Sequence, residues 1–159
     1  MSIYGYCRIS TAKQSIDRQI RNIKAEYPTA HIVQEAYTGT SIFRPEWLKL
    51  YRILRAGDVV VFDSVSRMSR NAEEGFTLYE DLYHKGIRLV FLKEHHIDTE
   101  TYKKALSGSI AMTGTNVDFI LKGINEYLMA LAKEQIKLAF EQSEKEVADL
   151  HQRTREGLL

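Results

Sequence analysis

The sequence predicts an α/β fold: a mainly parallel sheet flanked by helices, followed by one long C-terminal helix. Along the first 92 residues, short apolar runs rich in Val, Ile, Tyr and Phe alternate with longer segments of helical periodicity. This alternation is typical of parallel strands joined by helical crossovers. About forty residues without proline follow at the C-terminal end, and one stripe of them is apolar, which indicates a single long helix.

Glycines and prolines mark where the expected elements of the first part begin and end. Gly57 and Gly86 each precede an apolar run and favour the left-handed backbone that ends a helix. Pro28 and Pro45 stand at a helix end and a helix start, where the missing N–H costs little. The expected strands are Ile3–Arg8, His31–Ala36, Val59–Asp63 and Ile87–Leu92, and the expected helices are residues 14–27, 44–55 and 72–85.

After Leu92 the pattern changes to a polar stretch and one long helix. We expect the polar stretch to hold a short helix near residues 101–106, the α/β domain to cover residues 1–115 and the long helix residues 116–157. Forty helical residues extend roughly 60 Å, twice the width of a small domain, so pairing with a second subunit is favoured over packing wholly on its own sheet. The apolar stripe consists of Val117, Ile120, Leu121, Ile124, Leu128, Leu131, Leu138, Val147 and Leu150.

Composition narrows the class of protein. The sequence has no apolar run of the roughly 20 residues that span a bilayer and no signal-peptide pattern, so we expect a cytoplasmic protein without a membrane partner. The single cysteine, Cys7, allows no internal disulfide and is expected to be buried. Eleven Lys and Arg face six Asp and Glu in residues 1–70, an excess that ordinary surface variation also produces. The net charge of +1 predicts weak DNA binding by this chain alone.

The first candidate site residues follow the first expected strand, because reactive groups in open α/β sheets gather at the carboxyl ends of strands. Alternation places Tyr6, Arg8 and Ser10 on one face of the chain, with the Ser10 hydroxyl at the end of the strand beside a guanidinium. The alternative is that Ser10 or Thr11 only caps a helix that begins near Gln14.

Arginines follow the next two strands as well. Arg67 and Arg70 are three residues apart after the third strand, and they share one helical face if a helix begins there. Arg44 ends the loop after the second strand. A planar guanidinium gives two charge-assisted hydrogen bonds to phosphate oxygens, so this set suits a phosphodiester, although solvated arginines at helix starts are the alternative.

These motifs, in this order and spacing, resemble the resolvase/invertase family of serine recombinases. The resemblance covers about residues 1–97 and resumes near Glu146 to Gly157, where Glu-x6-Arg-Thr-x-x-Gly is similar to the end of the family's long dimerisation helix. The matching residues are the Tyr-x-Arg-x-Ser-Thr run from Tyr6, then Gln14 and Gln19, Gly39 with Arg44-Pro45, Gly57-Asp58, and the Ser-Arg-Met-Ser-Arg run from Ser66.

The resemblance implies the catalytic domain of a site-specific DNA recombinase. By this resemblance, Ser10 would attack a DNA phosphodiester and form a 5′-phosphoserine link, and strand exchange and religation would follow. Arg8, Arg67 and Arg70 would be catalytic, and Tyr6, Gln14, Gln19, Arg44 and Arg153 would support them or bind DNA. The resemblance also implies DNA rather than a small molecule as the substrate, no cofactor or metal, and homodimers that form synaptic homotetramers.

The sequence departs from the family's pattern at three points. Ser66 stands where many relatives carry Asp, so the general acid is unassigned, and Asp63 is left out of the expected site. Residues 98–122 form an insertion relative to the small resolvases, and the DNA-binding domain of relatives is expected to be absent from this chain.

Two other functions are weighed against the recombinase. One is a non-catalytic, recombinase-like oligomerisation module, which Ser66 favours. The other is a phosphoacceptor signalling domain, which would require paired acids after the first strand, where this sequence has Arg8 and Ser10.

Overall fold

The computed structural model describes residues 1–8, 16–36, 44–69, 71–101 and 117–157. In the last of these ranges the side chains are described for residues 119–142. Ser10, Gln14 and Arg70 therefore lie outside the described residues, and of Arg153 only the backbone is described. The short helix expected near residues 101–106 also lies outside them, apart from a helical turn at residues 99–101 that precedes this gap.

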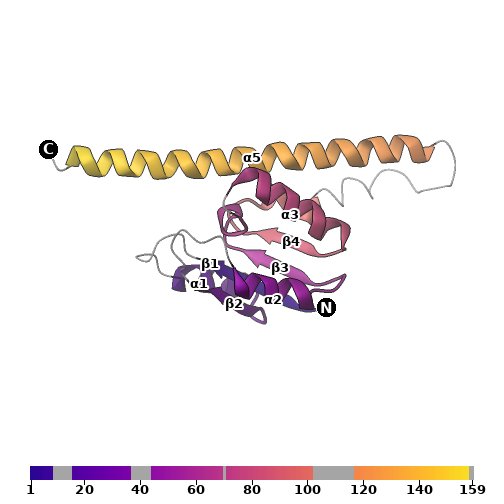
Figure 1. Cartoon of the computed structure of the whole chain (residues 1–159), viewed down its shortest axis with the longest axis horizontal. Helices are drawn as coiled ribbons and strands as arrows, with labels where there is room; N and C mark the ends of the chain where they lie inside the picture. The colour runs from indigo at the N-terminus through magenta and orange to yellow at the C-terminus, as the bar shows by residue number, and fades with distance from the viewer. Residues whose placement is uncertain (9–15, 37–43, 70, 102–116, 158–159) are drawn as a thin grey trace.

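The strands of the described residues form one parallel sheet, as predicted, in the order β2-β1-β3-β4 (Figure 1). Because all the strands run in the same direction, their carboxyl ends meet at one edge of the sheet. Tyr6 in β1 is in register with Phe62 in β3. The strands are β1 (Ile3–Arg8), β2 (His31–Glu35), β3 (Val59–Phe62) and β4 (Arg88–Phe91), each within one residue of its predicted ends.

Helices cover both faces of this sheet. The helix α1 (Asp17–Glu26) packs on one face, and α2 (Pro45–Ile53) and α3 (Ala72–His84) pack on the other. The helix expected near residues 14–27 is present, and in the described residues it begins at Asp17, whose acid suits the first turn of a helix. Its N-cap is Ile16, and the alternative in which Ser10 or Thr11 caps it falls on residues outside those the structure describes.

Alternation along β1 separates the two faces as predicted. Tyr6 faces α2 and α3, where its ring meets Trp47 and Phe62 at centroid distances of 5.1 and 6.0 Å. Cys7 faces α1 and is fully buried against Ile23. Burial, with a smaller contribution from the nearby Asp63 charge, raises the pKa of the Cys7 thiol to about 12. Such a thiol stays protonated at neutral pH and is a packing residue rather than a nucleophile.

The α-helix that would place Arg67 and Arg70 on one face does not begin at Arg67, and Arg70 lies outside the described residues. The chain after β3 makes a 3₁₀ turn, η1 (Val65–Arg67), and α3 begins only at Ala72. Extended backbone at Asn71 separates the turn from α3. The Asn71 side chain caps α3 by accepting a hydrogen bond from the Glu74 N–H at 2.9 Å.

The long helix α5 (Val117–Gly157) has 41 residues, as predicted, and it extends beyond the α/β domain (Figure 1). It packs on α3 and η1, and no helix of the described residues is long and apolar enough to cross a membrane. Gly75 in α3 allows this close packing, since a Cβ there would lie 2.6 Å from the Ser69 hydroxyl and 3.1 Å from the Phe140 ring. The side chains of α5 buried in the core of the domain are Met129, Ala132, Ile136 and Phe140.

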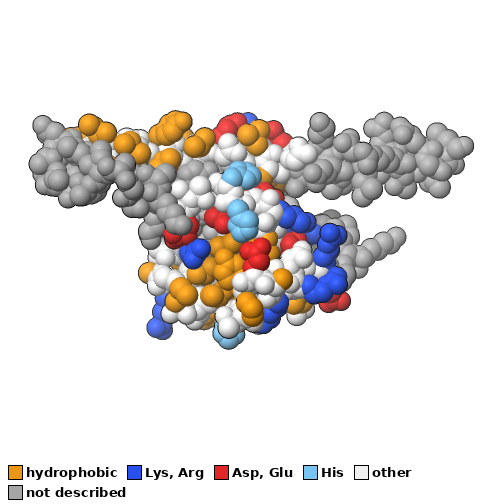
Figure 2. Space-filling view, turned by 180° about the vertical axis from the view of Figure 1, so that it is seen from behind, with side chains coloured by type: hydrophobic (Ala, Val, Ile, Leu, Met, Phe, Trp, Pro, Cys, Tyr) orange, Lys and Arg blue, Asp and Glu red, His pale blue; other side chains and the backbone are white. Residues whose placement is uncertain are grey.

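The apolar stripe of α5 is divided between two surfaces, which differs from the single stripe predicted. Leu128 packs against the core of the domain and Leu121 is buried, whereas Leu131 and Leu138 are exposed. Figure 2 shows apolar side chains along the outer side of this helix. The exposed large apolar side chains of α5 among the described residues are Phe119, Ile120, Tyr127, Leu131 and Leu138, and the last four are called here the outer stripe.

The amino edge of the sheet is closed by two glycine turns. Gly57 and Gly86 have φ angles of 94° and 79°, the left-handed backbone predicted for them. The Gly57 N–H donates to the Gly86 carbonyl at 2.9 Å, which joins the two turns. Asp58 completes this edge by accepting hydrogen bonds from the main-chain nitrogens of Ser2 and Arg55, each at 3.0 Å.

Candidate active site at the carboxyl edge of the sheet

Five of the residues singled out in the sequence lie together at the carboxyl end of β1. They come from four segments that are distant in the chain: β1, α1, the residue before α2, and η1. Ser10, Gln14 and Arg70 cannot be placed among them, because they lie outside the described residues. The five described residues are Tyr6, Arg8, Gln19, Arg44 and Arg67.

Arg8 joins the first strand to the loop after the third. Its Nη2 donates to the carbonyls of Ser66 at 2.6 Å and Ser69 at 3.1 Å, and its Nε donates to the carbonyl of Arg67 at 3.3 Å. A rigid guanidinium fork is suited to bind several carbonyls at once. Arg8 thus holds in place the loop that carries Arg67.

Gln19 fixes the end of β1. Its side chain is buried, the Arg8 N–H donates to its Oε1 at 3.1 Å, and its Nε2 donates to the Arg8 carbonyl at 2.8 Å. Both ends of the amide are therefore bound to the main chain of one residue. The visible role of Gln19 is to set the backbone from which the chain continues to Ser10.

Arg44 stands at the N-cap of α2 and also binds the loop after β3. Its Nη1 donates to the Met68 carbonyl at 2.7 Å, and its Nη2 lies 3.5 Å from the Glu74 carboxylate. The guanidinium lies over the rings of Tyr6 and Trp47, at 5.9 and 5.8 Å from their centroids. Arg44 and Arg8 therefore hold the same loop from two sides.

Glu35 is a buried carboxylate at the end of β2 that the sequence analysis missed. The Tyr6 hydroxyl and the main-chain N–H of Trp47 donate to its Oε2, each at 2.9 Å. The main-chain N–H of Glu46 donates to its Oε1 at 3.3 Å. The carboxylate thereby caps α2, where a negative charge is favourable. A signal existed in the sequence: Arg44 is a poor capping residue, so the cap of α2 had to come from elsewhere.

The arginines of the site lie close enough for their charges to act on one another. Burial lowers the pKa of Arg8, and repulsion from Arg44 and Arg67 lowers it further. Burial also lowers the pKa of Arg67, although the Asp63 charge opposes this. Figure 2 shows Lys and Arg side chains on the side of the domain to which the strands' carboxyl ends point. Like charges that repel one another in a partly desolvated place favour a bound anion.

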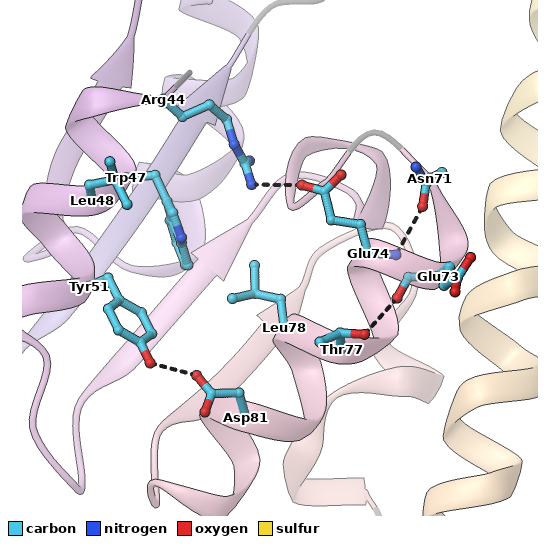
Figure 3. A pocket seen from close by; sticks show the side chains of 10 residues that line it. All are labelled: Arg44, Trp47, Leu48, Tyr51, Asn71, Glu73, Glu74, Thr77, Leu78 and Asp81. Atoms are coloured by element: carbon cyan, nitrogen blue, oxygen red, sulfur yellow. Dashed lines mark hydrogen bonds and ion pairs between the residues drawn. The ribbon is translucent and has the colours of Figure 1, made fainter. Parts of the chain in front are cut away.

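The groove beside these arginines is apolar at its floor and acidic along α3. It measures about 730 Å³ and lies between α2 and α3, with Arg44 reaching across it to Glu74 (Figure 3). Its floor is apolar, from residues such as Trp47 and Leu78, but α3 lines it with carboxylates that would repel a phosphate. The described residues contain no group of three or more His, Cys, Asp or Glu side chains that could hold a metal ion. The acids of the groove are Glu73, Glu74 and Asp81.

Comparison with known protein families shows to which family the chain belongs. A family model described as "Resolvase, N terminal domain" matches residues 3–146. The chain belongs to the resolvase family. This assignment confirms the resemblance found in the sequence, and the match extends across the insertion and into α5.

Individual relatives have modest sequence identity to this chain. The chain is 27% identical to the transposon Tn21 resolvase of Escherichia coli, over 96% of the chain and 83% of that protein. It is 31% identical to a resolvase of Clostridium perfringens, over 61% of the chain and 52% of that protein. The chain therefore spans most of the first relative and about half of the second.

Solved structures share the fold. The N-terminal catalytic domain of TP901-1 integrase matches with a TM-score of 0.52 and 24% identity, covering 82% of this chain and 98% of that domain. A resolvase family site-specific recombinase from Streptococcus pneumoniae matches with a TM-score of 0.50 and 18% identity, covering 100% and 99%. At these identities the likeness shows the fold: a parallel sheet with flanking helices and a long C-terminal helix.

Proposed function

We propose that this resolvase domain is the catalytic domain of a site-specific DNA recombinase, with Ser10 as its nucleophile. The observation that carries the proposal is the gathering of Arg8, Arg44 and Arg67 at one edge of the sheet. Ser10 follows Arg8 by two residues, and Gln19 fixes the backbone from which it extends. Family membership supports the same reaction class.

In the proposed reaction the Ser10 hydroxyl loses its proton and its oxygen attacks the phosphorus of a DNA phosphodiester. A bond from phosphorus to the Ser10 oxygen forms, and the bond to the 3′ oxygen breaks. The products are a 5′-phosphoserine link and a free 3′-hydroxyl, which takes up a proton. Fixed positive charge favours the serine alkoxide and stabilises the extra charge of the five-coordinate transition state.

Religation is the reverse of this attack. After strand exchange, the 3′-hydroxyl of another strand attacks the phosphoserine, and Ser10 leaves as a hydroxyl. One phosphodiester is exchanged for another through a phosphoserine ester of similar energy. The cycle therefore needs no nucleotide as a source of energy. Arg70 and Gln14 are proposed to complete the phosphate site, and Arg153 to support it from α5.

Neighbouring residues are proposed to hold Arg44 in the position from which it acts. Glu35 caps α2 and accepts the Tyr6 hydroxyl, and both the helix start and the Tyr6 ring lie against Arg44. Burial raises the pKa of Tyr6, although Arg44 opposes this, so the phenol stays protonated and keeps donating to Glu35. Tyr6 and Glu35 are positioning residues in this scheme.

The outer stripe of α5 is proposed as the surface for a homodimer and for the synaptic homotetramer of strand exchange. Its four apolar side chains recur at spacings of four or seven residues along one side of the helix. A DNA substrate would place this assembly in the cytoplasm. Sedimentation should give dimers that Leu131→Lys weakens, and a strict monomer at high concentration would contradict the assignment.

The experiment uses the full chain fused at its C-terminus to a zinc-finger array that binds a known DNA sequence. The substrate is supercoiled DNA in which two array sites flank a randomised central segment. Wild-type protein is expected to give a protein–DNA adduct that survives denaturing electrophoresis, and Ser10→Ala is expected to give none. An adduct that persists in Ser10→Ala would overturn the role of Ser10.

The second candidate is a recombinase-like oligomerisation module without catalysis. It is favoured by one observation: Ser66 offers no carboxylic acid beside Arg67, and its hydroxyl is within 2.7 Å of the Ser64 hydroxyl. The same experiment separates the two functions. Dimers without any adduct, under all DNA and salt conditions tested, would support the module.

A further inference from the structure

Glu94, which follows β4, carries a carboxylate that binds the loop after β3. Its Oε2 accepts a hydrogen bond from the main-chain N–H of Val65 at 3.1 Å. Val65 is the first residue of η1, and it is fully buried. The first N–H groups of a helical turn have no partner within the turn, and a buried N–H without an acceptor is destabilising. The Glu94 carboxylate therefore caps η1.

The residue before η1 does not supply this cap. The Ser64 hydroxyl lies 2.7 Å from the Ser66 hydroxyl and makes no capping hydrogen bond. Glu94, in contrast, reaches η1 from a fixed main chain. Its N–H donates to the Phe91 carbonyl at 3.1 Å, and its carbonyl accepts from the Ile97 N–H at 3.0 Å. The segment after β4 thus holds the start of η1 in place.

The remainder of the same loop is held by the arginines. Arg8 and Arg44 donate to the main-chain carbonyls of residues 66–69. Within the turn, the Arg67 N–H donates to the Ser64 carbonyl at 3.0 Å. The carboxylate accepts from the first N–H of the turn, and the guanidinium groups donate to the carbonyls that follow. The main chain of Arg67 is therefore fixed from both sides.

Arg44 is held by the same kind of contact. The Glu35 carboxylate, at the end of β2, accepts from the main-chain N–H of Trp47 in the first turn of α2, whose N-cap is Arg44. In both places a carboxylate at or beyond the end of a strand binds a main-chain N–H at the start of a helical turn. In both places that turn begins at, or contains, an arginine of the site.

We propose that Glu94 is a positioning residue: its hydrogen bond to the Val65 N–H fixes η1, and thereby the main chain from which the Arg67 guanidinium extends to the DNA phosphate. The carboxylate itself does not touch DNA in this scheme. The inference rests on the proposed function, in which Arg67 binds the reacting phosphate. The sequence analysis did not single out Glu94, because its partner lies 29 residues earlier in the chain.

The test compares Glu94→Ala with Glu100→Ala in the zinc-finger fusion. Glu100 lies in the same segment after β4, but its carboxylate is paired at 3.9 Å with Arg88, at the opposite end of β4. A small displacement of a group that binds the reacting phosphate lowers the rate. Adduct formation in a single turnover is expected to slow about tenfold in Glu94→Ala and less than about twofold in Glu100→Ala. Equal rates in the two variants would overturn the inference.

The conservative variant Glu94→Gln tests the hydrogen bond itself. Glutamine keeps an oxygen that accepts from the Val65 N–H, so adduct formation is expected to recover to within about threefold of wild type. A rate as low as that of Glu94→Ala would contradict the assigned hydrogen bond. If Glu94→Ala does not fold, Glu94→Asp replaces it, because its carboxylate is one methylene shorter. Its expected loss is about threefold, and an unchanged rate would refute the inference.

A double-mutant cycle with Arg67→Ala separates the positioning of Arg67 from general damage. If Glu94 acts through Arg67, adding Glu94→Ala to Arg67→Ala changes the residual rate by less than about twofold. An undiminished loss of about tenfold in that background would show that Glu94 acts elsewhere, against the proposal.

A DNA-free measurement keeps this inference distinguishable from the proposed function. In the full chain, protection of the Val65 amide from hydrogen exchange reports the contact, and the NMR order parameter of the Arg67 Nε–H reports the guanidinium. Both are expected to fall in Glu94→Ala but not in Glu100→Ala. An Arg67 side chain that stays ordered in Glu94→Ala would overturn the inference even if wild-type protein forms the adduct. Loss of order in Glu94→Ala, with no adduct from wild-type protein, would support the positioning of Arg67 and overturn the proposed function.

Discussion

The two ends of strand β3 use buried charge in opposite ways. At the amino end, Asp58 accepts from two main-chain nitrogens, and the adjoining glycine turns bind each other. At the carboxyl end, Arg8 and Arg44 donate to the carbonyls of residues 66–69. The first arrangement binds a carboxylate and two turns through main-chain groups, whereas the second gathers arginine side chains from several segments. The comparison teaches that one edge stabilises the fold and the other is available for a ligand.

The largest expected effect is the loss of cleavage when a guanidinium is removed from the carboxyl edge. Arg8→Ala should lower the rate of adduct formation by about a hundredfold or more, because a donor to the transition-state charge is lost. The same is expected of Arg67→Ala and Arg70→Ala. Arg8→Lys is the matched control: it keeps the charge but not the fork that binds three carbonyls, so it too should be impaired. Near-normal cleavage by Arg8→Ala would remove Arg8 from the site.

A smaller effect on cleavage is expected from a substitution of Glu35, which contributes both to the stability of the fold and to the site. Glu35→Gln keeps the shape but removes the charge that caps α2, so the free energy of unfolding should fall by about 1 kcal/mol. Because Arg44 stands at that helix start, adduct formation should also slow about tenfold. Urea unfolding and single-turnover cleavage measure the two effects. Cleavage at the wild-type rate would place Glu35 with Asp58, as a residue of stability alone.

The smallest effect is expected from a substitution at the amino edge, which should lower stability and leave cleavage unchanged. Burial raises the pKa of Asp58, but hydrogen bonds from Ser2 and Arg55 outweigh it, so the pKa of the folded protein is lowered. A lowered pKa contributes stability above the unfolded value of about 3.9 and loses it as pH falls through the folded value. Asp58→Asn should therefore cost about 1 kcal/mol at pH 7.

Below about pH 4 the difference between wild type and Asp58→Asn should begin to shrink, and it should disappear only below the lowered pKa of the folded Asp58 carboxylate. Urea unfolding at pH 7 and at several lower pH values, down to about pH 3, measures the difference. A stability difference that does not shrink at the lower pH values would assign the effect to packing rather than to the charge.

Local pattern was sufficient to predict the sheet, its carboxyl edge and α5. Alternation placed Tyr6 and Cys7 on opposite faces, and the arginines after successive strands were brought together by the parallel order. What local pattern could not predict depends on distant partners. Glu35 caps a helix ten residues further along the chain, and Asp63 is held by Asn22 from α1. The outer stripe of α5 became distinct only once Leu128 and Ile136 were packed on the domain.

The central claim is that Ser10 forms a covalent bond to DNA phosphate at this edge. The most direct measurement is to isolate the denatured adduct, digest the DNA and protein, and sequence the nucleotide-bearing peptide by mass spectrometry. We predict a nucleotide linked through its 5′-phosphate to Ser10, with a free 3′-hydroxyl on the other side of the break. A nucleotide on any other residue, or one linked through its 3′-phosphate, would contradict the account.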